Sequence, residues 1–350
     1  MTAARDAAPL LSVEGLCVDY RTSRRGLFRA VDGVDLDIWA GETLGLVGES
    51  GSGKSTVAKA VLGIAPVSGG RITFDGAVLD PQRVRRRRPV TDIQVIFQDP
   101  VSSLDPTKTV GYTVAEPLIA TMRGRRGGDG EVRQRVAEML DRVGLPAGAA
   151  ARYPAQFSGG QRQRIAIARA LIMRPRLVIC DEAVSALDLS IQAQILNLLD
   201  EIQRDLGLSY LFISHDLSVV EHISDRVVVL YRGRIMETGG AAQVHGAPEH
   251  PYTRALLAAA PVHDPALQRE RREQRRRLRA APTRRAPVGE NCPFVHRCPF
   301  AVDRCAQERP VLRATAGGGL AACHLIGELP ATEPVPSAAA RPAASTRGAS

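Results

Sequence analysis

A glycine-rich stretch, Thr43 to Thr56 (TLGLVGESGSGKST), has residue types and a spacing that suit the binding of phosphate groups. Four residues separate Gly48 from the run Gly53, Lys54 and Ser55, as in the pattern G-x-x-x-x-G-K-[ST]. Glycines let consecutive N–H groups converge on an anion, the lysine adds a positive charge, and the serine hydroxyl can ligate Mg²⁺. The pattern predicts a nucleoside triphosphate site made of Gly48, Glu49, Ser50, Gly51, Ser52, Gly53, Lys54, Ser55 and Thr56.

Polar side chains stand at the ends of three later apolar runs: Gln98 after 93–97, Asp181 and Glu182 after 177–180, and His215 after 210–213. In open α/β sheets, ligands gather at the carboxyl ends of the strands. Successive strand residues point in opposite directions, so one acid can serve Mg²⁺ while the other faces a water. We therefore expect Gln98 near the Mg²⁺ ion or the attacking water. Of the two acids, we expect one to bind Mg²⁺ and the other to face the water.

A second candidate for phosphate binding is the turn Ser158, Gly159, Gly160 and Gln161, which leads into the helical pattern QRQRIAIARALIM. Ser158 is in a capping position, and a helix N-terminus can bind an anion. A plain capped helix is the alternative for this turn taken alone.

The elements that must position these residues follow from apolar periodicity. Leu44 to Val47 is expected to be a buried strand, and the chain restarts as a helix at Lys54. Leu10 to Tyr20 and the alternating Val34, Leu36 and Ile38 are expected to be strands, as is a hairpin around Asp75-Gly76. Helical patterns at 110–122 and 131–143 indicate an insertion between residues 99 and 157. The fold class is α/β, with a mixed sheet, an antiparallel β subdomain and an inserted helical subdomain.

Composition limits the function classes. The chain has 350 residues and a formal net charge of +9, but only three of its 46 basic residues are lysine, which is typical of a GC-rich coding bias. Basicity is therefore weak support for a nucleic-acid partner. No apolar run approaches the ~18 residues of a membrane span, and no signal peptide is recognisable at the start. We expect a soluble cytoplasmic protein.

Four of the six cysteines crowd a short C-terminal segment, Cys292, Cys298, Cys305 and Cys323. Without a secretion signal, such a cluster favours a metal over disulfides. Four thiolates suit Zn²⁺ or a [4Fe–4S] cluster equally well, and the spacing does not choose between them.

Taken together, these motifs resemble those of an ATP-binding-cassette (ABC) ATPase, over about residues 10–261. GESGSGKST is similar to the Walker A motif, Gln98 to the Q-loop, FSGGQ to the family signature and LVICDE to Walker B. SALD with Asp188 is similar to the D-loop, His215 to the switch histidine and Tyr20 to the aromatic that stacks on adenine. Three further segments narrow the resemblance to one group of ABC ATPases. They resemble the second ATPase of dipeptide and oligopeptide importers, and they are VIFQDPVSSLDP, HPYTRALLAAAP and the terminal CPF-x-x-RCPF segment. Ala183 departs from the family, which generally has proline there.

The resemblance implies a mechanism and partners. Two ATPase subunits, expected to be non-identical chains, would close head to tail around two ATP molecules, with Ser158, Gly159, Gly160 and Gln161 acting on the partner's ATP. Ser55, Gln98 and Asp181 would surround Mg²⁺, Glu182 would polarise water and His215 would sense the γ-phosphate. Two membrane permease subunits and an extracytoplasmic solute-binding protein would complete an importer at the cytoplasmic face of the membrane, with no nucleic acid. The resemblance favours the iron–sulfur cluster over Zn²⁺.

Two other functions stay open. One is an importer for nickel or another small solute, since substrate choice belongs to other subunits. The other is a soluble ABC ATPase of DNA repair or ribosomes, which the single phosphate-binding loop disfavours. The expected divisions are an ATPase core at 10–98 and 158–261, a helical subdomain at 99–157, a basic linker at 262–290, a Cys-rich module at 291–327 and a disordered tail at 328–350.

Overall fold

A computed structural model of the chain describes residues 8–21, 26–79, 91–98, 104–122, 129–259 and 290–330. The predicted basic linker up to residue 289, and all of the predicted tail beyond residue 330, therefore lie outside the described residues. Within the described residues, no helix combines the length and apolar character needed to cross a membrane.

The central sheet is mixed, with strand order β11-β12-β10-β9-β3-β8-β7-β6. Its parallel strands are β6, β7, β8, β3 and β9, of which the first four carry the predicted apolar runs, and β10 joins β9 through an antiparallel hairpin. Their bounds are β3 (Thr43–Val47), β6 (Ile93–Ile96), β7 (Leu177–Asp181), β8 (Ser209–Ser214), β9 (Arg226–Tyr231), β10 (Arg234–Gly240), β11 (Arg313–Ala314) and β12 (Leu320–Ala321). This order places the carboxyl ends of the neighbouring parallel strands β6, β7 and β8, with their polar residues, along one edge of the sheet.

Side chains of the parallel strands alternate between two cores. On β8, Tyr210 and Phe212 belong to the core on the helical face, whereas Leu211 and Ile213 belong to the other core. A strand buried on both faces has apolar residues at every position, which is why these runs are continuous rather than alternating.

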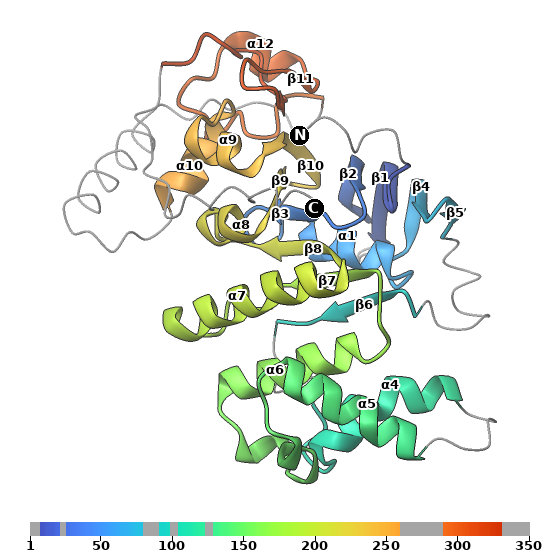
Figure 1. Cartoon of the computed structure of the whole chain (residues 1–350). Coiled ribbons are helices and arrows are strands. Elements are labelled where there is room, and N and C mark those ends of the chain that lie inside the picture. Colours follow the sequence, from blue (N-terminus) through green and yellow to red (C-terminus); the bar gives the residue numbers. More distant parts are fainter. Residues whose placement is uncertain are drawn as a thin grey trace, which may run out of the picture.

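A second, antiparallel sheet packs on the face opposite the large helices, with strand order β2-β1-β4-β5 (Figure 1). It consists of β1 (Leu11–Arg21), β2 (Leu27–Ile38), β4 (Val67–Phe74) and β5 (Ala77–Val78). The predicted hairpin is present, and both Asp75 and Gly76 have positive φ, as a tight two-residue hairpin turn requires. This sheet is the predicted antiparallel subdomain.

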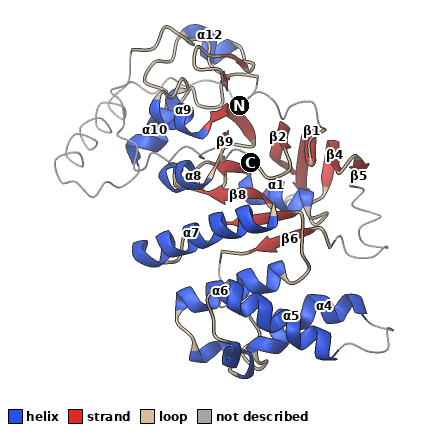
Figure 2. Cartoon of the chain, in the orientation of Figure 1, coloured by secondary structure: helices blue, strands red, loops and turns tan. Residues whose placement is uncertain are grey.

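The helices gather mainly on one side and at one end of the molecule (Figure 2). α1 follows β3, and α4, α5 and α6 contact one another as the predicted helical insertion and the helix after it. The bounds are α1 (Lys54–Val61), α4 (Val110–Met122), α5 (Asp129–Arg142), α6 (Gly159–Leu171), α7 (Leu189–Leu206), α8 (Leu217–Ile223), α9 (Ala241–Gly246), α10 (Pro251–Ala259) and α12 (Asp303–Gln307). Short 3₁₀ turns cover Ala147–Ala151 and Pro154–Gln156.

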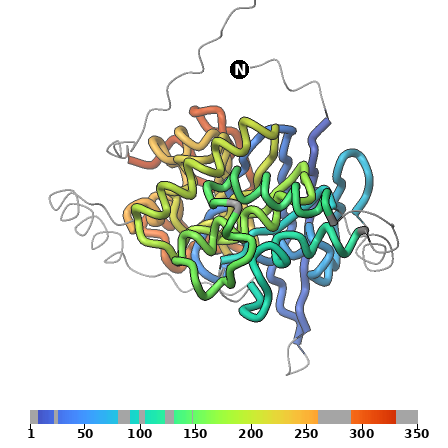
Figure 3. The backbone as a smooth tube through the Cα atoms, turned by 60° about the horizontal axis from the view of Figure 1, so that its bottom comes forward, coloured from blue at the N-terminus to red at the C-terminus, as the bar shows by residue number. Residues whose placement is uncertain are grey.

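Residues 290–330, called the C-terminal segment below, pack onto the core. β12 pairs with β10, and the Ala322 N–H donates to the Met236 carbonyl at 2.8 Å. Phe294 and Val295 belong to the same buried cluster as the helical core. Figures 1 and 3 both show this segment, in orange and red, against α9 and α10.

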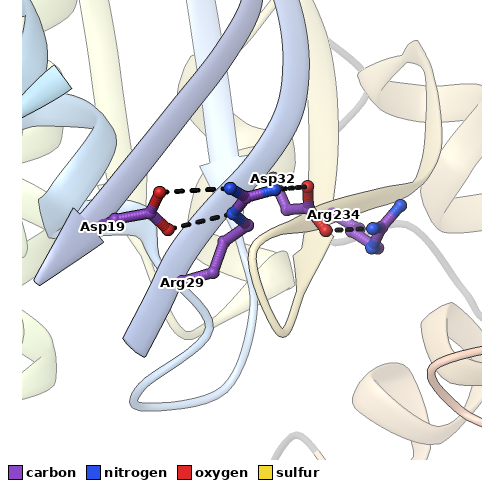
Figure 4. Close-up of polar contacts among 4 residues, drawn as sticks. All are labelled: Asp19, Arg29, Asp32 and Arg234. Carbon is purple, nitrogen blue, oxygen red and sulfur yellow. Dashed lines mark hydrogen bonds and ion pairs between the residues drawn. The ribbon is translucent and has the colours of Figure 1, made fainter. Parts of the chain in front are cut away.

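A chain of charged groups joins the two sheets (Figure 4). The Arg29 guanidinium donates to both carboxylate oxygens of Asp19, at 2.9 and 3.1 Å, and to Asp32. Asp32 in turn pairs with Arg234 at the start of β10, and its N–H donates to the Gly233 carbonyl at 2.9 Å. The β9–β10 turn is thereby fixed between the antiparallel sheet and the phosphate-binding loop.

Candidate nucleotide site

The loop between β3 and α1 has the backbone that its glycines predict. Gly53 has φ +108° immediately before the helix, a conformation that L side chains rarely adopt. A Cβ on Gly48 would lie 2.1 Å from the Leu230 carbonyl oxygen, so a side chain there is excluded. The Gly233 N–H donates to the Ser52 carbonyl at 2.7 Å. The loop is therefore held by its own turns and by the β9–β10 hairpin.

Lys54 is buried, and its ammonium folds back over this loop. Its Nζ donates to the carbonyl oxygens of Gly48 at 2.7 Å and of Glu49 at 3.0 Å. Burial lowers the pKa of Lys54, while the charges of Glu182, Asp181 and Glu49 oppose this effect. A cation held in this way is placed to meet the phosphates of a bound nucleotide.

Ser55 and Asp181 meet between α1 and β7. The Ser55 hydroxyl donates to Asp181 Oδ1 at 3.0 Å. Burial raises the pKa of Asp181, the hydrogen bond from Ser55 opposes the rise, and the charge of Glu182 adds to it. A hydroxyl and a carboxylate are hard oxygen donors of the kind that Mg²⁺ accepts, so the residues present fit this ion.

Glu182 and His215 lie side by side at the ends of β7 and β8. The distance from His215 Nδ1 to Glu182 Oε2 is 3.7 Å, with Glu182 largely covered and His215 more than half exposed. Glu182 has φ +52°, which is unusual for a residue with a side chain, and its N–H donates to the Ile213 carbonyl at 3.0 Å. Such backbone strain occurs where the surroundings hold a functional side chain in place.

Two residues predicted for the nucleotide site, Gln98 and Tyr20, form no hydrogen bond with the other residues of that site within the described part of the chain. Gln98 is exposed just beyond β6. Tyr20 is half-buried near the end of β1, directly opposite Phe28 on β2. Their predicted roles rest on the sequence alone.

The turn from Ser158 to Gln161, predicted as a second phosphate-binding feature, caps the N-terminus of α6. Ser158 Oγ accepts from the Gln161 N–H, and Gln161 Oε1 accepts from the Ser158 N–H at 3.1 Å, which forms a capping box. A Cβ on Gly160 would lie 2.5 Å from Ile191, so this glycine allows α6 to approach α7. Asp188 caps α7 by accepting from the Ile191 N–H at 3.0 Å. The polar groups of Ser158 and Asp188 remain exposed.

The four C-terminal cysteines come together in part. The Cys292 N–H donates to the Cys305 carbonyl at 3.0 Å. Burial raises the pKa of Cys292 to about 11 and of Cys298 to about 12. Over the residues that the structure describes, no three potential ligands are arranged as a formed metal site. The donor types suit a metal, but the geometry of a loaded site is not present.

Two residues at the phosphate-binding loop were not predicted. The Glu49 N–H donates to the Tyr252 hydroxyl at 2.8 Å, and the Glu49 carboxylate accepts two hydrogen bonds of 2.7 Å from Arg297. The bonds from Arg297 hold the pKa of Glu49 below its usual range. Tyr252 lies in the segment HPYTRALL and Arg297 in the segment RCPF, both of which carry the resemblance to peptide-importer ATPases. The spacing of residues within these segments did not indicate that either residue contacts Glu49.

Two family profiles match the chain. The profile described as ABC transporter matches residues 31–185, and the profile described as oligopeptide/dipeptide transporter, C-terminal region, matches residues 236–305. The first contains the phosphate-binding loop, Gln98, the capped turn at Ser158 and the acidic pair, and the second contains Tyr252 and three of the four clustered cysteines.

Individual relatives agree with these profiles. The chain is 50% identical over 288 residues to the oligopeptide transport ATP-binding protein OppF of Salmonella typhimurium, covering 82% of this chain and 85% of that protein. It is 48% identical over 318 residues to a putative peptide import ATP-binding protein of Brucella ovis, covering 90% and 97%. Among solved structures, a dimeric ATP-binding cassette, MJ0796, bound to ADP and Pi after hydrolysis matches with a TM-score of 0.57 at 29% identity, covering 66% of this chain and 98% of that one.

Proposed function

The chain belongs to the ATP-binding subunits of ABC transporters, and we propose that it energises the import of dipeptides and oligopeptides through separate membrane permeases. The observation that carries this proposal is the presence, in one chain, of the ABC transporter profile and the oligopeptide/dipeptide C-terminal profile. ATP hydrolysis is the activity of the family, and the contact of Ser55 with Asp181 supports it, because it unites the hydroxyl of the phosphate-binding loop with a strand-end carboxylate.

The proposed roles follow from the site. The loop from Gly48 to Thr56 binds the phosphates, with Lys54 supplying charge, and Tyr20 stacks on the base. Ser55, Gln98 and Asp181 hold Mg²⁺, which neutralises charge on the phosphates when it is bound. Glu182 accepts the proton of the attacking water, and His215, beside it at 3.7 Å, contacts the γ-phosphate.

Hydrolysis is proposed to require two cassettes. The exposed cap at Ser158 to Gln161 acts on the nucleotide of a partner subunit, and Asp188 lies at that interface. The partner is proposed to be a second, non-identical ATPase. Exposure of these capped ends supports the role, because a helix N-terminus open to solvent can accept a phosphate from another molecule.

The proposed assembly has two permeases and an extracytoplasmic solute-binding protein, with this chain peripheral at the cytoplasmic face. The proposed domains are the core at 10–98 and 158–261, the helical subdomain at 99–157, which docks on the permeases, and the module at 291–327. Closure of the two cassettes on ATP would drive the permeases between their two states.

We propose that Cys292, Cys298, Cys305 and Cys323 hold a [4Fe–4S] cluster, with Zn²⁺ as the alternative. The four soft ligands in one short segment, with the backbones of Cys292 and Cys305 joined by a 3.0 Å hydrogen bond, support this proposal. Anaerobic purification followed by metal analysis and a visible absorption spectrum tests it. Iron with a broad visible absorption band is expected, zinc without colour would select the alternative, and absence of both metals would contradict a metal site.

The importer itself is tested by purifying this chain from detergent-solubilised native membranes and identifying the proteins that accompany it. Two permeases, a second ATPase and a peptide-binding protein are expected. Recovery of a nickel-binding or other solute-binding protein would redirect the substrate. Recovery of ribosomes or repair proteins alone would contradict transport while leaving the ATPase chemistry intact.

A further inference from the structure

The contact between the C-terminal segment and the phosphate-binding loop has no role in the site described above. Arg297 Nη1 and Nη2 each lie 2.7 Å from an oxygen of Glu49, so the pair is bidentate. The two residues are 248 positions apart in the sequence. Parallel hydrogen bonds of this kind fix orientation as well as distance.

Aromatic rings hold the Arg297 guanidinium in place. Its carbon lies 5.4 Å from the ring centre of Phe294 and 5.8 Å from that of Tyr231. Those rings pack against Tyr252, at 5.3 and 4.5 Å between ring centres. The same Tyr252 accepts the Glu49 N–H. Two groups of one packed cluster therefore bind the backbone and the side chain of a single loop residue.

Glu49 places a negative charge in a loop that must receive a triphosphate. Its charge acts on Lys54, the cation that would meet the phosphates. Uncompensated, the carboxylate would repel an anionic ligand bound by the same loop. Arg297 supplies the compensating positive charge from the C-terminal segment.

We propose that Arg297 is a positioning residue for ATP: it neutralises Glu49 and fixes the first turn of the loop, so full nucleotide affinity depends on the docked C-terminal segment. This inference rests on the proposed nucleotide site. Both side chains are roughly half exposed, so the pair adds little to the stability of the fold. Its effect is on nucleotide affinity.

The test is a titration of the full chain with a fluorescent ATP analogue and Mg²⁺, for the wild type, Arg297→Gln, Glu49→Gln and the double variant. Arg297→Gln is expected to weaken binding roughly fivefold to tenfold, with an unchanged Tm. Glu49→Gln is expected to bind ATP more tightly than the wild type, because the negative charge is removed while Arg297 stays positive, and the double variant is expected to recover most of the loss. The control is Arg304→Gln, because Arg304 forms an equally bidentate pair with Glu308 inside the same segment, and it should leave the affinity unchanged.

The outcomes separate charge compensation from a structural role. Wild-type affinity in Arg297→Gln would overturn the proposal. An equally weak double variant would also overturn it, since removal of the Glu49 charge would then restore nothing. If Arg297→Gln does not fold, Arg297→Lys keeps the charge, and a loss of affinity as large as tenfold in that folded variant would contradict compensation. Failure of the wild type to bind ATP would remove the proposed nucleotide site itself.

Discussion

Ser55 Oγ and Asp181 Oδ1 lie 3.0 Å apart, although 126 residues separate them in the sequence. One comes from the first turn of α1 and the other from the end of β7. The contact therefore brings together the two residues that are proposed to hold Mg²⁺ during ATP hydrolysis. Several expected outcomes depend on it.

Replacing Ser55 by alanine should raise the Mg²⁺ concentration needed for hydrolysis on the order of tenfold or more, because one oxygen ligand is removed. Ser55→Thr keeps the hydroxyl and is the control. The measurement is the ATPase rate of the assembled transporter as Mg²⁺ is varied. An unchanged Mg²⁺ dependence in Ser55→Ala would exclude Ser55 as a ligand.

Asp181→Asn should stabilise the nucleotide-free chain while abolishing turnover. Burial raises the pKa of Asp181, so the folded state binds this proton more tightly than the unfolded state does. Protonated Asp181 therefore stabilises the folded chain at low pH. This stabilisation is lost as the pH rises from the ordinary pKa of aspartate through the raised pKa of the folded state. The Tm of Asp181→Asn should exceed that of the wild type at pH 7, and the difference should shrink towards pH 4. A wild type that is more stable at pH 7 would contradict this assignment.

Glu182→Gln should retain ATP binding and lose turnover by about 10²–10⁴-fold, since the amide cannot accept the proton of the attacking water. The matched control is Glu201→Gln on the exposed surface of α7, which should have wild-type activity. Binding of a fluorescent ATP analogue and release of phosphate are measured in parallel. Near-normal hydrolysis by Glu182→Gln would remove Glu182 from its role.

Ser158→Asp should separate the structural and functional parts of the signature turn. Aspartate caps a helix about as well as serine, so the Tm should stay close to that of the wild type. A carboxylate facing a partner's triphosphate should repel it and reduce ATPase activity of the assembled transporter by tenfold or more, roughly 1.4 kcal/mol. Nucleotide binding by the separate chain should not change. Full activity of this variant would contradict the action of Ser158 on phosphate.

Phe294→Ala should destabilise the chain by about 3–5 kcal/mol, because Phe294 is only 2% exposed and joins the C-terminal segment to Tyr231 and Tyr252. The Tm should fall by roughly 5–15 °C. The control, Phe28→Ala, removes a ring that is 56% exposed and should have a small effect. Similar Tm values for the two variants would show that the segment does not depend on this ring.

Local patterns predicted the parallel strands and the phosphate-binding loop well, because those elements depend on apolar runs and on glycine. The helix after the loop was expected to start at Lys54, and α1 runs from Lys54 to Val61. The strand expected at 93–97 ends at Ile96, and Phe97 is exposed. Boundaries shift in this way because the last residue of an apolar run need not be paired.

Long-range features left no local signal. β12 has two residues, too few for any periodicity, yet its pairing with β10 attaches the C-terminal segment to the central sheet. The positive φ of Glu182 is imposed by its surroundings, since glutamate does not favour it. The contact between Arg297 and Glu49 required both the fold of the segment and the loop. Such contacts follow from topology and could not be inferred from spacing.

ATP-driven peptide import is tested by uptake of a radiolabelled tripeptide into cells that lack this chain and are complemented with either the wild type or Glu182→Gln. We expect uptake with the wild type and almost none with Glu182→Gln, although both proteins reach the membrane. Equal uptake with the two, or no dependence on the chain while nickel uptake does depend on it, would contradict an ATP-driven peptide importer.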